Sequence, residues 1–282
     1  MKTTFKCPIC NVVTQYYCDN GNYCPNCFSV FAQTIPSDEE LNDYYKTFNE
    51  EYYGGGRLKG ANCRQLLYAN KYLKIVNRFC KPNSSLIDIG SSNNPFPNIA
   101  QDKGYQVTVV DYVKPKELNS NIKFIQSSIE NINFDNLDQF EIVTAFAIIE
   151  HTKDPLLAIH NLVKITKNMG IIIIYVPEIG EFSDKYALGT SNWFCPPMHL
   201  NLLSKKALKH ILEENNCKLI FSNKFELSLL RYCIRYSIGY IEGCVGYLFK
   251  ILFGLDAWLK IRQKRKSKYQ GMRYFVFKKV IG

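Results

Sequence analysis

Short apolar segments alternate with amphipathic segments through the middle of the chain. Five apolar segments are expected to form β-strands, and they cover residues 86–90, 106–111, 122–125, 140–146 and 170–176. Between the last two, residues 155–166 place Leu156, Ile159 and Leu162 at the spacing of one helix face. Because strands alternate with helices, the pattern predicts an α/β fold with a doubly wound, mainly parallel sheet.

The end of the chain adds two more expected strands and an insertion. A helix over 204–215, with Ser204 as its N-cap, precedes strands at 218–225 and 273–279, which brings the sheet to seven strands. Residues 229–268 are rich in Leu, Ile, Tyr and Phe but are interrupted by charges, so we expect amphipathic helices there. Two roles stay open for this insertion: peripheral contact with a membrane, or a helical cap that forms a substrate lid or a dimer contact.

The segment before the first strand divides in two. Residues 36–60 are polar and aromatic and contain Gly54, Gly55 and Gly56, which are typical of a hinge, a loop that closes over a ligand or a plain linker. Residues 61–80 show helical periodicity. We therefore interpret residues 36–84 as a linker and an N-terminal helical lid.

Composition narrows the class of protein. With 282 residues, of which 46% are hydrophobic and 21% charged, the chain can bury a core, which excludes wholesale disorder. It has no uncharged apolar stretch of about 18 residues, so we expect no transmembrane helix. The N-terminus lacks the apolar core of a signal peptide. We expect a cytoplasmic location, with peripheral contact at the inner membrane face if residues 229–268 bind lipid.

The formal net charge of +10 is concentrated at the C-terminal end. Residues 257–282 hold nine of the 35 Lys and Arg residues and no acidic residue, whereas the rest of the chain is nearly neutral. Such a strip can face a nucleic acid, an anionic membrane or a phosphorylated substrate. Because residues 1–35 carry only Lys2 and Lys6, we do not expect a nucleic acid partner.

Two CxxC pairs near the N-terminus are the sharpest chemical signal. They are Cys7, Cys10, Cys24 and Cys27, with thirteen residues between the pairs. Two such pairs suit a tetrahedral Zn²⁺ site, and a segment of about 30 residues needs a staple because it cannot bury its own core. We predict a structural zinc ribbon over residues 1–35, with a tight turn at Asn20-Gly21. The alternative is a small hairpin with four ordinary thiols.

Polar residues follow the first two expected strands. Asp88 and Gly90 lie at the end of the first, and Asp111 ends the second about 20 residues later. In a βαβ unit this first turn lets the backbone approach a ligand, and the second acid accepts hydrogen bonds from ribose hydroxyls. Asp88 would repel a pyrophosphate but suits a cationic ligand. The pattern therefore favours S-adenosylmethionine (SAM) over NAD.

Residues 85–225 resemble the class I SAM-dependent methyltransferases and are most similar to the branch that methylates sugars and other small molecules. The motifs occur in the family's order, at residues 86–94, 109–111, 124–134, 145–151, 176–178 and 197–204. The resemblance implies a Rossmann-like seven-stranded sheet in a methyltransferase domain over residues 85–282. A Cys₄ element before such a domain also resembles some nucleotide-sugar methyltransferases.

The resemblance also implies which residues bind SAM. They are Asp88, Gly90, Ser91, Ser92, Asn94, Asp111, Tyr112, Ser128, Ile129, Ala145 and Phe146. Asp111 would hold the ribose and Tyr112 would stack on the adenine. Ser92 and Asn94 replace two glycines of the family's loop, and Asn tolerates the left-handed φ region. Ser128 replaces an Asp that contacts the adenine amino group, and its hydroxyl can still form that hydrogen bond.

Histidine is the natural base for an alcohol or activated carbon acceptor at neutral pH. We expect His160 and His210 on helix surfaces, and His151 and His199 in loops that face the substrate. His151 and His199 are therefore the predicted catalytic residues. The alternative for His151 is a structural role, in which it caps a helix end or orients Glu150.

Three functions follow from these patterns. The first is SAM-dependent methylation of a sugar, a nucleotide- or lipid-linked glycan precursor or a related small molecule. The second is an RNA methyltransferase with a zinc ribbon. Against it, the chain lacks the Asn-Pro-Pro-aromatic and Pro-Cys motifs of such enzymes. The third is a non-catalytic, zinc-stapled scaffold with a degenerate SAM pocket.

Overall fold

A computed structural model describes residues 5–41, 43–44, 47, 58–135, 137–177, 179, 193–223 and 272–281. The predicted glycine hinge, the insertion at residues 229–268 and the last residue of the 176–178 motif lie outside the described residues. All described residues except Asn223 belong to one compact unit, formed by Met1–Ser222 and Met272–Gly282. Within the described part of the chain, no helix is both long and apolar enough to cross a membrane.

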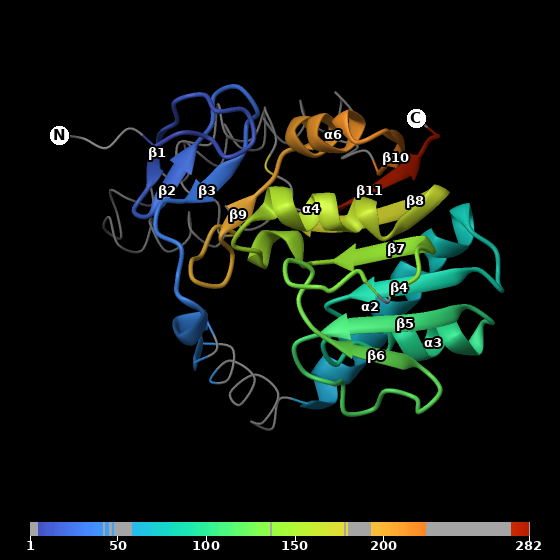
Figure 1. The fold of residues 1–282 in the computed structure, drawn as a ribbon. Coiled ribbons are helices and arrows are strands. Elements are labelled where there is room, and N and C mark those ends of the chain that lie inside the picture. Colours follow the sequence, from blue (N-terminus) through green and yellow to red (C-terminus); the bar gives the residue numbers. More distant parts are fainter. Residues whose placement is uncertain are drawn as a thin grey trace, which may run out of the picture. The chain divides into compact units, whose positions relative to one another are not determined.

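The central feature of this unit is a seven-stranded sheet in the order β10-β11-β8-β7-β4-β5-β6. Its strands are β4 (Ser85–Ile89), β5 (Gln106–Asp111), β6 (Lys123–Gln126), β7 (Phe140–Phe146), β8 (Thr166–Pro177), β10 (Cys217–Ser222) and β11 (Met272–Lys279). Strands β4 to β8 pair in parallel, and β11 is antiparallel to both β8 and β10. Figure 1 shows the arrowheads of β4, β5 and β7 pointing the same way. The predicted doubly wound, Rossmann-like sheet is confirmed.

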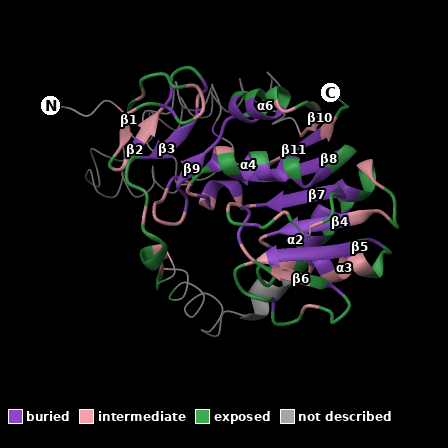
Figure 2. Cartoon of the chain, viewed as in Figure 1, coloured by how far each residue is buried: buried purple, intermediate pink, exposed green. Residues whose placement is uncertain are grey.

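Helices cover both faces of this sheet. Helices α2 (Leu58–Phe79) and α3 (Phe96–Asp102) pack with Leu86, Ile142 and Ile173. Helices α4 (Pro155–Lys164) and α6 (Lys205–Glu214) pack with the neighbouring residues Ile87, Val143 and Ile172. Successive strand residues point to opposite faces, so continuous apolar strands are buried on both sides. Figure 2 shows the inner strands β4, β5, β7 and β8 as mostly buried, the edge strands β6 and β10 as partly exposed, and exposed residues on the outer faces of the helices.

The strand and helix limits depart most from the expected ones at β8, and β10 ends at Ser222 rather than at residue 225. Strand β8 begins at Thr166 and not at residue 170, because Thr166 pairs with Phe140 ahead of a register shift between Phe140 and Ile142. Helix α4 accordingly ends at Lys164, and Ser204 caps α6 by accepting the Ala207 N–H, as predicted. Helix α2 contributes the buried residues Ala69 and Val76 to the same core as the sheet. The end of the segment expected to form a lid is thus a packed layer of the fold.

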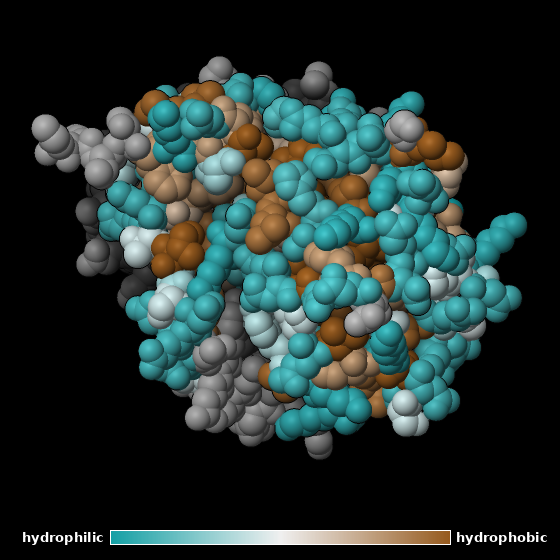
Figure 3. Space-filling view, in the orientation of Figure 1, coloured by the Kyte–Doolittle hydropathy of each residue, from teal (hydrophilic) through white to brown (hydrophobic). Residues whose placement is uncertain are grey.

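A second, four-stranded sheet carries the N-terminal cysteines. Its order is β1-β2-β3-β9, from β1 (Gln15–Cys18), β2 (Gly21–Tyr23), β3 (Val30–Ala32) and β9 (Asn201–Leu202). The turn between β1 and β2 is Asp19-Asn20, one residue before the expected position, with Asn20 at φ +62°. Strand β2 begins at Gly21, where a larger residue would be crowded because a Cβ would lie 2.7 Å from both Cys18 Sγ and a ring atom of Phe194. Figure 3 shows hydrophobic residues at the surface over this element, on a mostly hydrophilic face.

Candidate active site

The loop after β4 turns sharply at the carboxyl edge of the sheet. Gly90 has φ +70° and donates its N–H to Val110 O at 2.7 Å. A Cβ at Gly90 would lie 2.0 Å from Ile148 Cδ1, so only glycine fits there. Ser92 also adopts a left-handed conformation, with φ +48°, and its N–H donates to Asp111 Oδ2 at 2.7 Å. The loop is therefore held directly against the end of β5.

The structure corrects the expectation for Asn94. Among the described non-glycine residues of the loop, Ser92 takes the positive φ and Asn94 does not. Asn94 Oδ1 instead accepts the Phe96 N–H at 2.9 Å, a local turn that leads into α3. Ser91 Oγ is buried and has no hydrogen-bond partner among the described residues. A buried hydroxyl without a partner in a ligand-binding loop is available to a bound molecule.

Two carboxylates lie at the ends of β4 and β5. Asp88 is 3% exposed, and burial raises its pKa to about 7, although the Thr144 hydroxyl donates to Asp88 Oδ1 at 2.6 Å and opposes the shift. Burial also raises the pKa of Asp111, while N–H groups of Ser92 and Val113 act in the opposite direction. A carboxylate has about four lone pairs, so Asp111 keeps acceptor capacity for a ligand hydroxyl.

The remaining residues predicted to bind SAM are placed around the same strand ends. Tyr112 is 58% exposed, directly after β5. Ser128 is buried and its Oγ accepts the Asn131 N–H at 3.1 Å, which leaves its hydroxyl proton for another partner. Ile129 and Ala145 are buried in the core. These positions follow from the carboxyl ends of β5, β6 and β7, where parallel α/β sheets bind ligands.

Phe146, which is predicted to bind SAM, is part of an aromatic cluster. It stacks on Tyr72 of α2, with ring centroids 4.0 Å apart and planes at 10°. Tyr274 and Phe96 meet its ring edge-on at 6.4 and 5.2 Å. Tyr72 lies near enough to Asp88 for the carboxylate to raise its phenol pKa, after the larger effect of burial. Helix α2 thus reaches the site through Tyr72, a contact that sequence periodicity alone did not indicate.

The two predicted catalytic histidines lie side by side. Their ring centroids are 4.7 Å apart, with planes at 74°. His151 ends the short 3₁₀ helix Ile149–His151, and His199 precedes β9. Burial and, to a smaller extent, the neighbouring His199 together lower the pKa of His151 to about 3. Burial also lowers the pKa of His199. Both imidazoles are therefore neutral at pH 7. His160 and His210 lie exposed on α4 and α6, as expected.

Glu150 joins this histidine pair, and the sequence analysis gave it no role of its own. It is 2% exposed, and burial raises its pKa to about 8. One ligand atom each from Glu150, His151 and His199 lie within 4.8 Å of one another. The sequence feature that could have indicated a role for Glu150 is its position directly before His151, in the motif at residues 145–151.

The four N-terminal cysteines converge as predicted. Sγ–Sγ distances are 3.6 Å for Cys7–Cys27 and 3.4 Å for Cys10–Cys24, and all four sulfurs lie within 4.8 Å. The two CxxC turns have the same backbone hydrogen bonds. The N–H of Asn11 donates to Cys7 O and that of Phe28 to Cys24 O, at 2.9 and 2.8 Å. Asn11 and Phe28 both have positive φ, at 56° and 60°. Two equivalent turns thus aim four thiols at one point.

The cysteine element is joined to the histidine pair through backbone contacts. Strand β3 pairs with β9, two residues after His199, and Ala32 N donates to Leu200 O at 2.8 Å. Leu200 N in turn donates to Glu150 O at 2.7 Å. The fold of the N-terminal element therefore bears on the position of His199 and Glu150.

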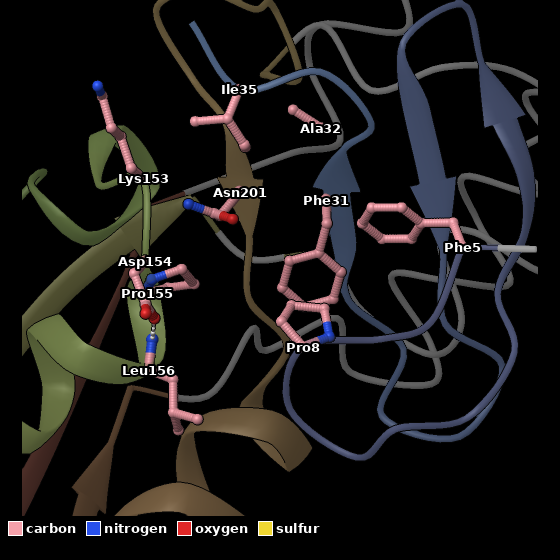
Figure 4. Close-up of a pocket in the computed structure, with 10 residues that line it drawn as sticks. All are labelled: Phe5, Pro8, Phe31, Ala32, Ile35, Lys153, Asp154, Pro155, Leu156 and Asn201. Atoms are coloured by element: carbon pink, nitrogen blue, oxygen red, sulfur yellow. Dashed lines mark hydrogen bonds between the residues drawn. The ribbon is translucent and has the colours of Figure 1, made fainter. Parts of the chain in front are cut away.

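A pocket of about 280 Å³ lies beside this junction. Figure 4 shows Phe31 and Pro8 of the cysteine element on one side and the first turn of α4, at Pro155 and Leu156, on the other. Asp154 caps that turn through hydrogen bonds from the N–H groups of Leu156 and Leu157. The residues that line this pocket include none of those predicted to bind SAM. Its lining includes Lys153 and Asn201, each two residues after one of the two histidines, but neither histidine itself, and the strand-end site is the better candidate for catalysis.

The sequence model of a family described as a methyltransferase domain matches residues 64–221, more than half of the chain. This match includes β4 to β8, the turn at Gly90, Asp111 and the histidine pair. The chain belongs to the class I SAM-dependent methyltransferases. A comparison with curated proteins gave no match.

Solved structures show that this methyltransferase shares its fold with enzymes of different specificity. One is the Burkholderia thailandensis 1,6-didemethyltoxoflavin-N1-methyltransferase, solved with 1,6-didemethyltoxoflavin and S-adenosylhomocysteine. It has a TM-score of 0.52 and 13% identity over 95% of this chain and 99% of that chain. Another is the [4+2]-cyclase SpnF, with a TM-score of 0.51 and 13% identity over 76% of this chain and 81% of that chain. At such identity the likeness shows the fold alone, and the reaction must be argued from the site.

Proposed function

We propose that this methyltransferase transfers the methyl group of SAM to a small-molecule acceptor, and that the acceptor is a sugar or a nucleotide- or lipid-linked glycan precursor. The observation that carries the proposal is the Ser92–Asp111 contact. It closes the first turn onto the second strand and leaves acceptor capacity on Asp111 beside the unpartnered hydroxyl of Ser91. These are the groups that a ribose and an amino acid moiety require.

The residues of the loop divide the binding task. Asp111 would accept hydrogen bonds from the ribose hydroxyls, and Tyr112 would cover the adenine beside Ser128 and Ile129. Asp88 would face the cationic methionine end. When bound, SAM supplies an electrophilic methyl group, and the sulfur keeps the electron pair when its bond to that carbon breaks. The protein then has mainly to orient the two reactants.

The acceptor would lie on the side of the histidine pair. Ile148 packs over Gly90 and is three residues from His151. One short segment, residues 148–151, therefore contacts the loop after β4 and also carries one of the two histidines. Each imidazole is neutral, so its unprotonated nitrogen could accept the proton that an acceptor hydroxyl loses. His151 and His199 therefore remain the candidates for the base in this proposal.

We further propose that the Cys7, Cys10, Cys24 and Cys27 cluster holds a structural Zn²⁺. Its support is the repeated turn geometry and the N–H groups of Ile9 and Cys27 that point at Cys7 Sγ and Cys24 Sγ, at 3.4 Å each. Such second-layer contacts orient and stabilise thiolates around a metal. All four positions are then occupied by protein ligands, which is the mark of a structural site.

Calorimetric titration of the zinc-loaded protein with SAM tests the donor site. Asp111→Ala should abolish binding, and Asp102→Ala, on the exposed end of α3, should bind as the unaltered protein does. Absence of binding by the folded, unaltered protein would contradict the proposal and favour the scaffold function. Formation of S-adenosylhomocysteine with nucleotide sugars, lipid-linked sugars and tRNA as acceptors then tests the acceptor class. Turnover with tRNA alone would replace the glycan proposal by the RNA alternative.

A further inference from the structure

We propose that Glu150, His151 and His199 form a second metal site, which binds a divalent transition-metal ion such as Zn²⁺ or Co²⁺. This site is separate from the four cysteines, whose ligands come from the N-terminal element. It does not depend on SAM binding, so it can fail or hold independently of the proposed function.

The backbone fixes the tautomer of both histidines. His151 Nδ1 lies 2.7 Å from Met198 O, and His199 Nδ1 lies 2.5 Å from Trp193 O. A carbonyl oxygen can only accept, so each Nδ1 carries the proton and each neutral ring has its lone pair on Nε2. Metal-binding histidines are oriented in this way, with the second ring nitrogen donating to a carbonyl or carboxylate.

A second observation, independent of the histidines, is a buried side-chain oxygen of Glu150 that has no partner among the described residues. Its side chain is 2% exposed, and its Oε2 is fully buried without a hydrogen-bond partner among the described residues. A buried, ionised carboxylate without a partner is strongly unfavourable, so Glu150 either holds a proton, as its raised pKa indicates for the protein without a metal, or binds a cation that displaces that proton. No Lys or Arg makes an ion pair with Glu150 in the described part of the chain.

The donor set selects the kind of metal. Two imidazoles and one carboxylate suit Zn²⁺ and related transition ions, and they leave a fourth position open. Tetrahedral ligands about 2.0–2.2 Å from such an ion lie roughly 3.4 Å apart. One nitrogen of each imidazole and one carboxylate oxygen lie within 4.8 Å of one another, so the side chains would have to close by up to about 1.4 Å to reach that spacing. An all-oxygen site of the kind that Mg²⁺ or Ca²⁺ prefers does not fit these ligands.

The open position has a consequence for catalysis, and this consequence alone rests on the proposed function. An acceptor oxygen bound to the ion there would lose its proton to water more readily. The histidines would then act as metal ligands and not as the base.

Metal counting on the full chain tests the site without any turnover. The protein is stripped, reloaded with Zn²⁺, dialysed and analysed by mass spectrometry of the metal. We expect about two ions per chain in the unaltered protein and about one in His199→Gln and in Glu150→Gln. The matched control is His210→Gln, on the exposed face of α6, which should keep both ions. A single ion in the unaltered protein that Cys24→Ser removes would overturn the proposal.

Cobalt distinguishes the two sites if a variant folds poorly. Co²⁺ bound by four thiolates shows sulfur-to-metal charge-transfer absorption, whereas nitrogen and oxygen ligands do not produce it. We expect Cys24→Ser to retain one Co²⁺ per chain and to lack that absorption band. We expect the double variant Cys24→Ser/His199→Gln to lose this remaining Co²⁺. Complete loss of cobalt in Cys24→Ser, with the fold of the large sheet intact by circular dichroism, would contradict the second site.

Discussion

The hydroxyl of Ser204 joins two parts of the fold through a single atom. Its Oγ donates a hydrogen bond to Cys27 O and accepts the Ala207 N–H at 3.1 Å. The same residue therefore caps α6 and fastens the second CxxC turn to the methyltransferase sheet. Ser204 N adds a hydrogen bond to Ser29 Oγ at 3.1 Å. The N-terminal element is thus a support for the loop that carries His199.

Replacing Ser204 tests this junction. Ser204→Ala removes both the cap and the bond to Cys27 O, so we expect the free energy of unfolding to fall by about 1 to 2 kcal/mol. Urea denaturation measures this change. Ser120→Ala, at an exposed loop position, is the control and should stay near the unaltered stability. Equal stability of the two variants would show that Ser204 does not bear on the fold.

Removing a proposed zinc ligand should act locally first. Cys24→Ser should bind one zinc ion fewer and raise hydrogen exchange in β3 and β9, because both strands depend on the second CxxC turn. The central strands β4 and β7 should keep their protection, because pairing within the seven-stranded sheet holds them, although Cys24 shares a buried cluster with Ile87 and Val143. Cys18→Ser changes a cysteine of the same element outside the four-sulfur cluster and should keep its zinc. Unchanged zinc content in Cys24→Ser would argue against the predicted ribbon.

Gly90 should tolerate no side chain. Gly90→Ala costs about 1–2 kcal/mol for its left-handed φ and adds a clash with Ile148, so we expect lost stability and lost SAM binding. Gly104→Ala tests whether a loss of stability alone accounts for the loss of SAM binding. Its φ is +91°, but a Cβ there would meet Pro82 at an ordinary 3.5 Å, away from the strand ends. We expect that variant to be less stable yet to bind SAM with unchanged affinity by calorimetry.

The affinity for SAM should rise with pH through the pKa of Asp88. Burial raises this pKa from 3.8 to about 7, so the free protein holds Asp88 protonated between those values. Because the folded state holds this proton more tightly than the unfolded state does, the contribution of Asp88 to the free energy of unfolding is full below about pH 3.8 and decreases as the pH rises to about 7. A cationic ligand favours the ionised form, so SAM affinity should increase about tenfold between pH 6 and pH 8.

Two variants check the assignment of that pH dependence. Asp88→Asn should bind weakly and lose the dependence, whereas Thr144→Val should move it to higher pH. The Thr144 hydroxyl now stabilises the ionised carboxylate, and valine cannot replace that hydrogen bond. Asp111 and Tyr72 are the titratable neighbours of Asp88, and both remain in the two variants. A profile that is the same in all three proteins would contradict the role of Asp88.

The sequence by itself determined the central sheet, the convergence of the four cysteines and two residues at the ends of the first two strands of that sheet. The alternation of buried strands with amphipathic helices gave the doubly wound sheet, because period and burial are local properties of the chain. The CxxC spacing placed four sulfurs at one point, because each turn is only a few residues long. Glycine at position 90 and the acid at 111 were also evident, since the turn after the first strand constrains both.

Only the tertiary structure decided how distant segments meet. Glu150, His151 and His199 come together because β9 carries His199 back to the end of β7, 48 residues along the chain. Tyr72 reaches Phe146 because α2 packs on the face that α3 also covers. Ser92 took the left-handed φ in place of Asn94 because its N–H had to reach Asp111. Such contacts depend on the packing of whole elements, which no local pattern of residues specifies.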